Sequence, residues 1–253
     1  MGFADFRSRM QSGERLVGTF IKVPAYETIE YLHDTGLDFI CLDAEHSPFD
    51  RARMDACLAV ARALDFPTLV RVSSGSVENV LMALDSGALG IVCPHIDTVE
   101  KAEALARSAR FGEGGRGFAG STRWAGLTRR TMPEILSQSQ NETVVIAQIE
   151  EPEGVEASAE IAAVPGIDGL FVGPADLTVA YGETALWSDQ LMQAYAKVGA
   201  ACAAAGVANI TFVPGPAEAE RVAAHGVNVF FVSSEAGWMA AGARAAATAI
   251  KAP

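Results

Sequence analysis

Short apolar runs alternate with longer helical segments along the whole chain of 253 residues. Strict alternation of strands and helices predicts a parallel sheet covered by helices. The runs are rich in Val, Ile, Leu and Phe, as expected of parallel strands that are buried on both faces. We expect strands at Val17–Val23, Phe39–Ala44, Thr68–Val72, Gly90–Pro94, Thr143–Ile149, Gly169–Val172, Ala208–Val213 and Val229–Ser233.

The segments between these runs are amphipathic or alanine-rich, and several follow a breaker or a capping residue. The expected helices are a short extra one at Ala4–Gln11, then Ala25–Thr35, Asp50–Leu64, Val77–Asp85, Val99–Arg110, Gly154–Val164, Leu186–Ala205, Ala217–His225 and Ala236–Ile250. Eight strand–helix units predict an α/β fold, a (β/α)8 TIM barrel that forms a single domain over residues 1–253. An open sheet is the alternative, but no G-x-G-x-x-G motif follows the first strand. The longest connection, 111–142, is a candidate functional loop.

Composition excludes several classes of protein. The net charge of −12 argues against a nucleic-acid partner, because phosphate binding needs clustered Lys and Arg. The polar N-terminus does not look like a signal peptide, and no apolar run reaches the roughly 18 residues of a membrane span. We therefore expect a cytoplasmic protein with no membrane partner. No C-x-x-C pair occurs, and we expect buried free thiols at Cys41, Cys57, Cys93 and Cys202.

Polar residues gather where the expected strands end. In a barrel of this kind, chemistry takes place at the C-terminal ends of the strands. Polar groups directly after apolar runs are costly to desolvate unless they are paired or liganded. The strand ends carry Asp43, Glu45, His46, Arg71, Gln148, Glu150 and Asp176.

Glu150 and Asp176 follow neighbouring strands. Two carboxylates that converge repel each other, and one becomes hard to ionise unless a cation lies between them. Oxygen ligands without His or Cys alongside suit Mg²⁺ or Mn²⁺. Helix capping is the alternative, since Asp176 follows Pro174. Because the two carboxylates occur together with Gln148, we favour a metal site.

The remaining polar groups suggest acid–base and anion-binding roles. His46 has a side chain suited to proton transfer near neutral pH, whereas His95, at another strand end, is a candidate for the pocket wall. Arg71 could hold a carboxylate or stabilise an enolate oxygen; a buried ion pair with Asp43 or Glu45 is the alternative. Backbone N–H groups of Ala175 and Asp176 would bind a substrate carboxylate if they open a short helix.

Four separated stretches resemble the HpcH/HpaI aldolase family, the metal-dependent (class II) pyruvate aldolases. They are LDAEHSP, the arginine of LVRV, AQIEEPEG and GLFVGPADLT, and their order and spacing fit over nearly the whole chain. The resemblance implies that the metal ligands are Glu150 and Asp176. It also implies that Gln148 and the backbone of Ala175 bind the keto acid.

The resemblance further implies the catalytic groups. His46 would be the acid/base and Arg71 would stabilise the enolate. Asp85, late in the third of the helices that follow strands, would raise the basicity of His46, and Asp43 would orient His46 or a metal-bound water. One departure from the family pattern is the run from Arg116 to Trp124, which is shorter than in many family members. The alignment of Arg123 and Trp124 therefore stays open, and so does the part of the pocket that binds the aldehyde.

The activity implied by the resemblance is reversible cleavage of a 4-hydroxy-2-oxo acid into pyruvate, or a related 2-oxo acid, and an aldehyde. The implied cofactor is Mg²⁺, Mn²⁺ or Co²⁺, with Zn²⁺ as a further candidate. Family members are commonly hexamers, trimers of dimers that exchange their last helix. The apolar segment Ala236–Ile250 is compatible with such a homo-oligomer.

Three other functions stay open. A Schiff-base aldolase needs a lysine in the pocket, and only Lys22 of the four lysines lies near a strand end. A decarboxylase acting on an oxo acid such as oxaloacetate would use the same metal and Arg71. A barrel that only binds a metal–keto-acid complex would not need the pair of His46 and Asp85 for proton transfer.

Overall fold

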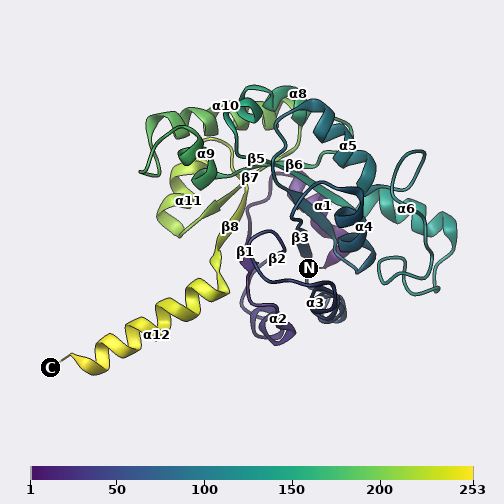
Figure 1. Ribbon diagram of the computed structural model, residues 1–253, viewed down its shortest axis with the longest axis horizontal. Coiled ribbons are helices and arrows are strands. Elements are labelled where there is room, and N and C mark those ends of the chain that lie inside the picture. The colour runs from purple at the N-terminus through teal and green to yellow at the C-terminus, as the bar shows by residue number, and fades with distance from the viewer. Residues whose placement is uncertain (1, 253) are drawn as a thin grey trace.

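The computed structural model describes residues 2–252 and contains a closed barrel of eight parallel strands in sequence order (Figure 1). The predicted (β/α)8 barrel is therefore confirmed. The first predicted strand ends two residues too late, while the others agree to within about a residue at each end, as is usual for such boundaries. The strands are β1 Leu16–Ile21, β2 Phe39–Asp43, β3 Thr68–Arg71, β4 Gly90–Cys93, β5 Val144–Ile149, β6 Gly169–Val172, β7 Ala208–Val213 and β8 Val229–Ser234.

Twelve helices surround or extend from this barrel within the described residues. They are α1 Phe3–Gln11, α2 Tyr26–His33, α3 Arg51–Ala63, α4 Val77–Asp85, α5 Val99–Ala109, α6 Met132–Glu142, α7 Pro152–Glu156, α8 Ser158–Ala162, α9 Pro174–Ala180, α10 Asp189–Ala205, α11 Pro216–Ala223 and α12 Glu235–Lys251. The extra N-terminal helix is confirmed as α1. The long connection contains the unpredicted helix α6, and the helix predicted at Gly154–Val164 is divided into α7 and α8.

Aromatic side chains fill the inside of the barrel. The ring of Phe231 lies 4.9 Å from that of Phe20, 4.8 Å from that of Phe39 and 5.0 Å from that of Phe171, measured between centroids. Helix α1 closes the N-terminal end, where Phe6 packs edge-on against Phe39 at 5.3 Å. These rings make the barrel interior a packed core, and barrels of this kind bind their ligands at the C-terminal mouth.

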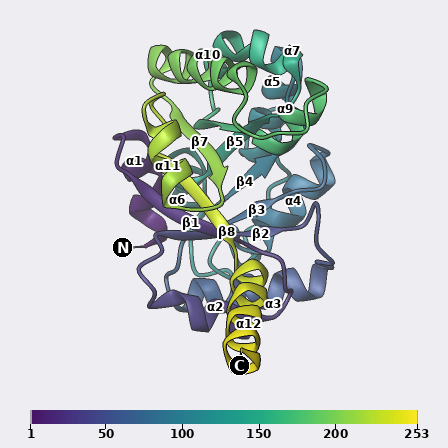
Figure 2. The same ribbon diagram turned by 90° about the vertical axis from the view of Figure 1, so that its left-hand side faces the viewer.

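Helix α12 differs from the other helices that follow strands. It leaves the end of β8 and projects away from the barrel (Figures 1 and 2). Only Glu235 of its 17 residues is buried, while Trp238, Met239 and Ile250 are exposed. Most helices in proteins are stabilised by packing of their apolar face, and the apolar residues of α12 lack this packing within one chain.

All four cysteines are buried free thiols, as predicted. Burial raises the pKa of the Cys93 thiol to about 12 and that of Cys202 to about 12. Across residues 2–252, none of the helices combines the length and the apolar character that crossing a membrane requires.

Candidate active site

Strand register places Lys22, Asp43 and Arg71 side by side at the mouth. Ile21 pairs with Leu42, which brings the next residues, Lys22 and Asp43, together, and Asp43 itself pairs with Arg71. The Lys22 Nζ atom lies 2.6 Å from Asp43 Oδ2. Arg71 donates from Nε to Asp43 Oδ1 and from Nη2 to Oδ2, each at 2.9 Å. The buried ion pair predicted as an alternative role of Arg71 is thus present.

Asp43 is fully buried, and its carboxylate accepts from two cations and one backbone group. The backbone N–H of His46 donates to Asp43 Oδ1 at 3.2 Å. Burial opposes ionisation, but the hydrogen bonds and charges of Arg71 and Lys22 outweigh it and lower the pKa of Asp43 to about 2. Asp43 therefore stays charged at neutral pH and holds the loop that begins at His46.

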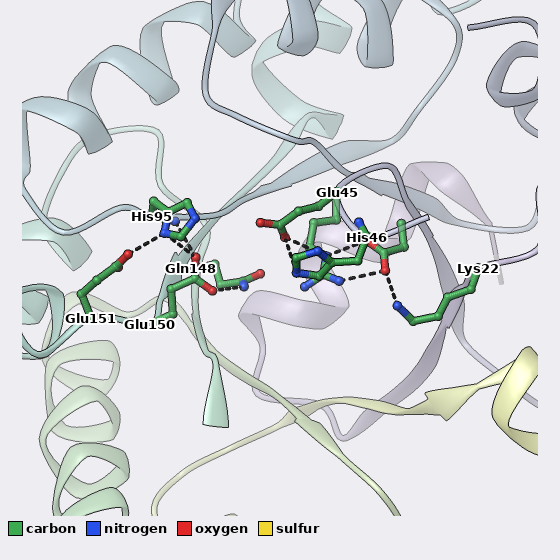
Figure 3. Close-up of polar contacts among 9 residues, drawn as sticks. Lys22, Glu45, His46, His95, Gln148, Glu150 and Glu151 are labelled. Carbon is green, nitrogen blue, oxygen red and sulfur yellow. Dashed lines mark hydrogen bonds and ion pairs between the residues drawn. The ribbon is translucent and has the colours of Figure 1, made fainter. Parts of the chain in front are cut away.

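Glu45 and His46 lie beside each other near Lys22 (Figure 3), and His46 is far more exposed than Asp43 and Arg71. Glu45 Oε2 is 3.3 Å from Arg71 Nε and 3.7 Å from His46 Nε2. Burial raises the pKa of Glu45 above its usual value. The imidazole of His46 is 59% exposed, so it can exchange protons with a ligand in the mouth.

Glu150 lies at the end of β5 between Gln148 and His95 (Figure 3). Gln148 donates from Nε2 to Glu150 Oε2. His95 donates its backbone N–H to Glu150 Oε1 at 2.8 Å, and its ring Nδ1 lies 3.1 Å from the same oxygen. Burial raises the pKa of Glu150, and the charge of Asp176 raises it further. The predicted repulsion between Glu150 and Asp176 is thus present.

Asp176 approaches Glu150 across Gly173. A β-carbon added at Gly173 would lie 3.3 Å from Glu150 Oε2 and 3.5 Å from Asp176 Oδ2. Ala175 and Asp176 lie in the first turn of α9, which is the short helix that an anion site at this place requires. Any side chain at position 173 would fill the space between the two carboxylates.

A cavity of about 250 Å³ opens at this mouth. Its wall includes Arg71, Gln148, Ala175 and Asp176, four of the residues predicted to bind substrate, together with Lys22. The guanidinium of Arg71 stacks on the ring of Phe20, 4.4 Å from its centroid. The predicted substrate residues therefore share one pocket, with apolar rings forming part of its wall.

His95 lies closer to the candidate metal-binding carboxylates than its sequence context indicates. One ligand atom each from Glu45, His95 and Glu150 lies within 4.8 Å of the others, a group that could hold a metal ion. His95 adopts a left-handed backbone conformation, with φ of 59°, which is uncommon for a residue other than glycine. The Glu151 carboxylate, which accepts a hydrogen bond from His95 Nδ1 at 2.5 Å, raises the pKa of His95. A strand-end position was its only sequence signal.

The structure does not bring Asp85 to His46. Asp85 ends α4, and the C-terminus of a helix that follows a strand lies at the opposite end of the barrel from the mouth. Its carboxylate Oδ1 lies 3.7 Å from Nε of the buried Arg116, and among residues 2–252 no contact joins it to His46. Within one chain, the predicted effect of Asp85 on His46 has no structural basis.

Arg123 and Trp124, whose alignment the sequence left open, lie in the long connection 111–142. Arg123 binds both oxygens of Asp55 at 2.9 Å. Trp124 is buried, and the Arg116 guanidinium lies 4.5 Å from its ring centroid and 4.0 Å from that of Phe111. Arg123 and Trp124 therefore pack in the long connection and do not line the mouth of their own barrel.

A closed barrel with carboxylates, a guanidinium and imidazoles around its C-terminal mouth has the layout of a barrel enzyme. The chain belongs to the HpcH/HpaI aldolase/citrate lyase family, whose model matches residues 16–240. It is 30% identical over 241 residues to a hydroxypyruvate/pyruvate aldolase of Paraburkholderia phytofirmans, covering 92% of both chains. It is 32% identical over 181 residues to a 4-hydroxy-2-oxovalerate aldolase of Novosphingobium aromaticivorans, covering 70% of this chain and 67% of that protein.

Solved structures agree with this family membership. A HpcH/HpaI aldolase/citrate lyase family protein from Burkholderia cenocepacia superimposes with a TM-score of 0.92 at 31% identity, over 98% of this chain and 100% of that one. The chain is accordingly a carbon–carbon lyase with the aldolase fold of this family.

Proposed function

We propose that the protein catalyses divalent-metal-dependent, reversible aldol cleavage of 4-hydroxy-2-oxo acids into pyruvate, or a related 2-oxo acid, and an aldehyde. The observation that carries this proposal is the approach of Glu150 and Asp176 across Gly173, next to a cavity lined by Arg71 and Gln148. The names of the aldolase relatives from Paraburkholderia and Novosphingobium support the substrate class.

The residues present fit a divalent cation. Burial and the neighbouring charge of Asp176 both disfavour the ionised form of Glu150, a cost that a cation would remove. Gln148 Oε1 is buried and lacks a hydrogen-bond partner among the described residues. Glu150 and Asp176 would hold Mg²⁺, Mn²⁺ or Co²⁺, with Zn²⁺ as a further candidate. Such an ion would act as a Lewis acid toward the 2-oxo group.

The protein's own groups would perform the remaining steps. Gln148 and the backbone N–H of Ala175 would orient the 2-oxo acid, and Arg71 would stabilise the enolate oxygen. His46 would accept the C4 hydroxyl proton as the C3–C4 bond breaks, leaving its electrons on the enolate and releasing the aldehyde. Protonation of C3 then gives the 2-oxo acid, and the reverse sequence forms the aldol.

The assignment of the carboxylates can be tested by replacing Glu150→Gln and Asp176→Asn, which keep the side-chain shapes. We expect each variant to lose most metal-dependent pyruvate release and to bind Mn²⁺ more weakly in a calorimetric titration. Glu153→Gln, at an exposed position in α7, is the control and should behave like wild type. Wild-type turnover and Mn²⁺ affinity in E150Q and D176N would rule the metal site out.

Two of the alternatives can be tested in the same experiments. Lys22 is ion-paired with the ionised carboxylate of Asp43, and an ammonium in such a pair is a poor nucleophile. Borohydride trapping with pyruvate should therefore leave Lys22 unmodified, whereas a trapped adduct would establish the Schiff-base route. Oxaloacetate decarboxylation would pass through the same enolate, so E150Q should abolish it together with aldol cleavage.

We also propose that the protein is a homo-oligomer, a hexamer built as a trimer of dimers that exchange α12. The exposed apolar residues of α12 support an exchange of this helix. The separation of Asp85 from His46 gives a further reason, because Asp85 can serve a catalytic histidine only if it reaches the mouth of another copy.

A further inference from the structure

Lys22 lines the mouth cavity but has no part in the chemistry proposed above. The proposed 2-oxo acid ligands are Gln148 of β5, the backbone of Ala175 in α9, and Arg71 of β3. Lys22 follows β1, and its side chain is 36% exposed. A charged group at this position changes the electrostatic field in the cavity whether or not it contacts the substrate.

Two cations, Lys22 and Arg71, and two carboxylates, those of Asp43 and Glu45, form one charged group whose formal charges sum to zero. Asp43 Oδ2 is shared between Lys22 Nζ at 2.6 Å and Arg71 Nη2 at 2.9 Å. Glu45 adds a second carboxylate 3.3 Å from Arg71 Nε. Arg71 alone therefore faces two carboxylates, and without Lys22 the group would be net negative by one charge, beside the place where a negative enolate has to form.

The backbone of Lys22 is held by a buried carboxylate from α12. Glu235, which is 4% exposed, accepts the backbone N–H of Lys22 at 2.7 Å and that of Val23 at 2.5 Å on the same Oε1 atom. Hydrogen bonds to a charged acceptor are roughly twice as strong as neutral ones. The end of β1 is thereby fixed to the first turn of α12, and the Lys22 side chain is directed at Asp43.

We propose that Lys22 is a positioning residue that Glu235 holds in place. The positive charge of Lys22 offsets the negative charge of Asp43, so that Arg71 keeps its capacity to stabilise an anion in the cavity. The inference rests on the aldolase function proposed above. Lys22 acts through Asp43 and Arg71, and its ammonium forms no bond with the substrate. It therefore affects enolate formation more strongly than binding of the uncharged part of the substrate.

The test compares Lys22→Met, which removes the charge, with Lys22→Arg, which keeps it. Lys197→Met is the matched control, because Lys197 forms an exposed ion pair with Glu156 on the outside of the barrel. We expect K22M to lower kcat about 10-fold or more while KM for the oxo acid changes less than about threefold. Inhibition by oxalate, a planar dianion that resembles an enolate, should weaken by a similar factor. K22R should recover most of both losses, and K197M should match wild type.

A separate measurement that does not depend on K22M covers the case in which this variant does not fold. The chain has four lysines, so reductive ¹³C-methylation gives few NMR signals, and Lys22 is assigned by its absence in K22R. Oxalate should shift the Lys22 signal and leave those of Lys197 and Lys251 in place. Glu235→Ala should shift it even without oxalate, because the end of β1 is released, while Glu235→Gln, which keeps an accepting oxygen, should shift it less.

Several outcomes would overturn the inference: wild-type kcat and oxalate inhibition in K22M, equal damage in K22M and K22R, or a Lys22 signal that ignores both oxalate and E235A. The proposed function fails separately. If wild-type protein shows no metal-dependent aldol turnover, the aldolase assignment is wrong. If wild-type protein is active and K22M is equally active, only the role of Lys22 is wrong.

Discussion

Asp43 should be the most important single charge for the stability of the barrel mouth. Its pKa is lowered from 3.8 to about 2 by Arg71 and Lys22 despite complete burial. A shift of one pKa unit corresponds to about 1.4 kcal/mol, so the ionised carboxylate contributes about 2 kcal/mol to the free energy of unfolding. Replacing Asp43→Asn keeps the shape, removes this contribution, and turns an amide N–H₂ group toward two cations.

The contribution has a defined pH dependence. Because the pKa of Asp43 is lower in the folded than in the unfolded protein, the stabilisation is complete above about pH 4 and is lost as the pH falls from about 4 toward 2. In a protein of this size, about 2 kcal/mol corresponds to a fall in Tm of about 4–8 °C. Calorimetry should show this difference between wild type and D43N from pH 7 to pH 5, and a smaller difference below pH 4.

A double-mutant cycle with Arg71→Met separates the ion pair from other effects. Removing either partner leaves the other charge buried without its main counter-charge, whereas removing both leaves no such charge. The double variant should therefore lose less stability than the sum of the single variants, by more than about 1 kcal/mol. Additive effects within about 0.5 kcal/mol would refute the claim that Arg71 is the group that stabilises Asp43.

Two further predictions concern regions outside the mouth. Arg116 is buried between the rings of Phe111 and Trp124, and burial lowers its pKa to about 10. Arg116→Met keeps the packing and removes the costly charge, so it should change the free energy of unfolding by less than about 1 kcal/mol. Arg116→Ala should lower the free energy of unfolding, measured in a urea titration, by about 2–3 kcal/mol. Equal losses in both variants would contradict this reasoning. Serine at Trp238 and Met239, both exposed on α12, should convert the oligomer to a smaller species in light scattering; a monomeric wild-type protein would disprove the exchange of α12.

The barrel could be predicted because buried parallel strands leave a strong sequence signal. Each strand lies in a short stretch rich in Val, Ile, Leu and Phe, and all eight were predicted. Helix α6 was missed although Thr131 and Glu134 form a capping box at its start, a pattern that can be read from sequence. No glycine or proline stands at Ala157, where α7 and α8 divide, and local sequence does not indicate the division.

The sequence predicted which residues lie at the barrel mouth, but it did not predict most of the contacts between them. Residues that end neighbouring parallel strands must lie close together, which accounts for Arg71 beside Asp43. Glu150 follows β5, and Asp176 lies near it in the first turn of α9, which follows the neighbouring strand β6. Applied to β1 and β2, the same rule places Lys22 next to Asp43, so this ion pair was within reach of sequence reasoning.

Asp85 shows that predicting contacts between residues also requires the direction in which each helix runs. A strand that ends at the mouth is followed by a helix that runs back to the other end, so a residue late in that helix cannot approach the mouth of its own barrel. The position of Asp85 at the end of α4 therefore already argues against a contact with His46 in the same chain. A motif implies a role for a residue, but only the topology decides whether that role can be served within one copy, and here the end of α4 lies away from the mouth.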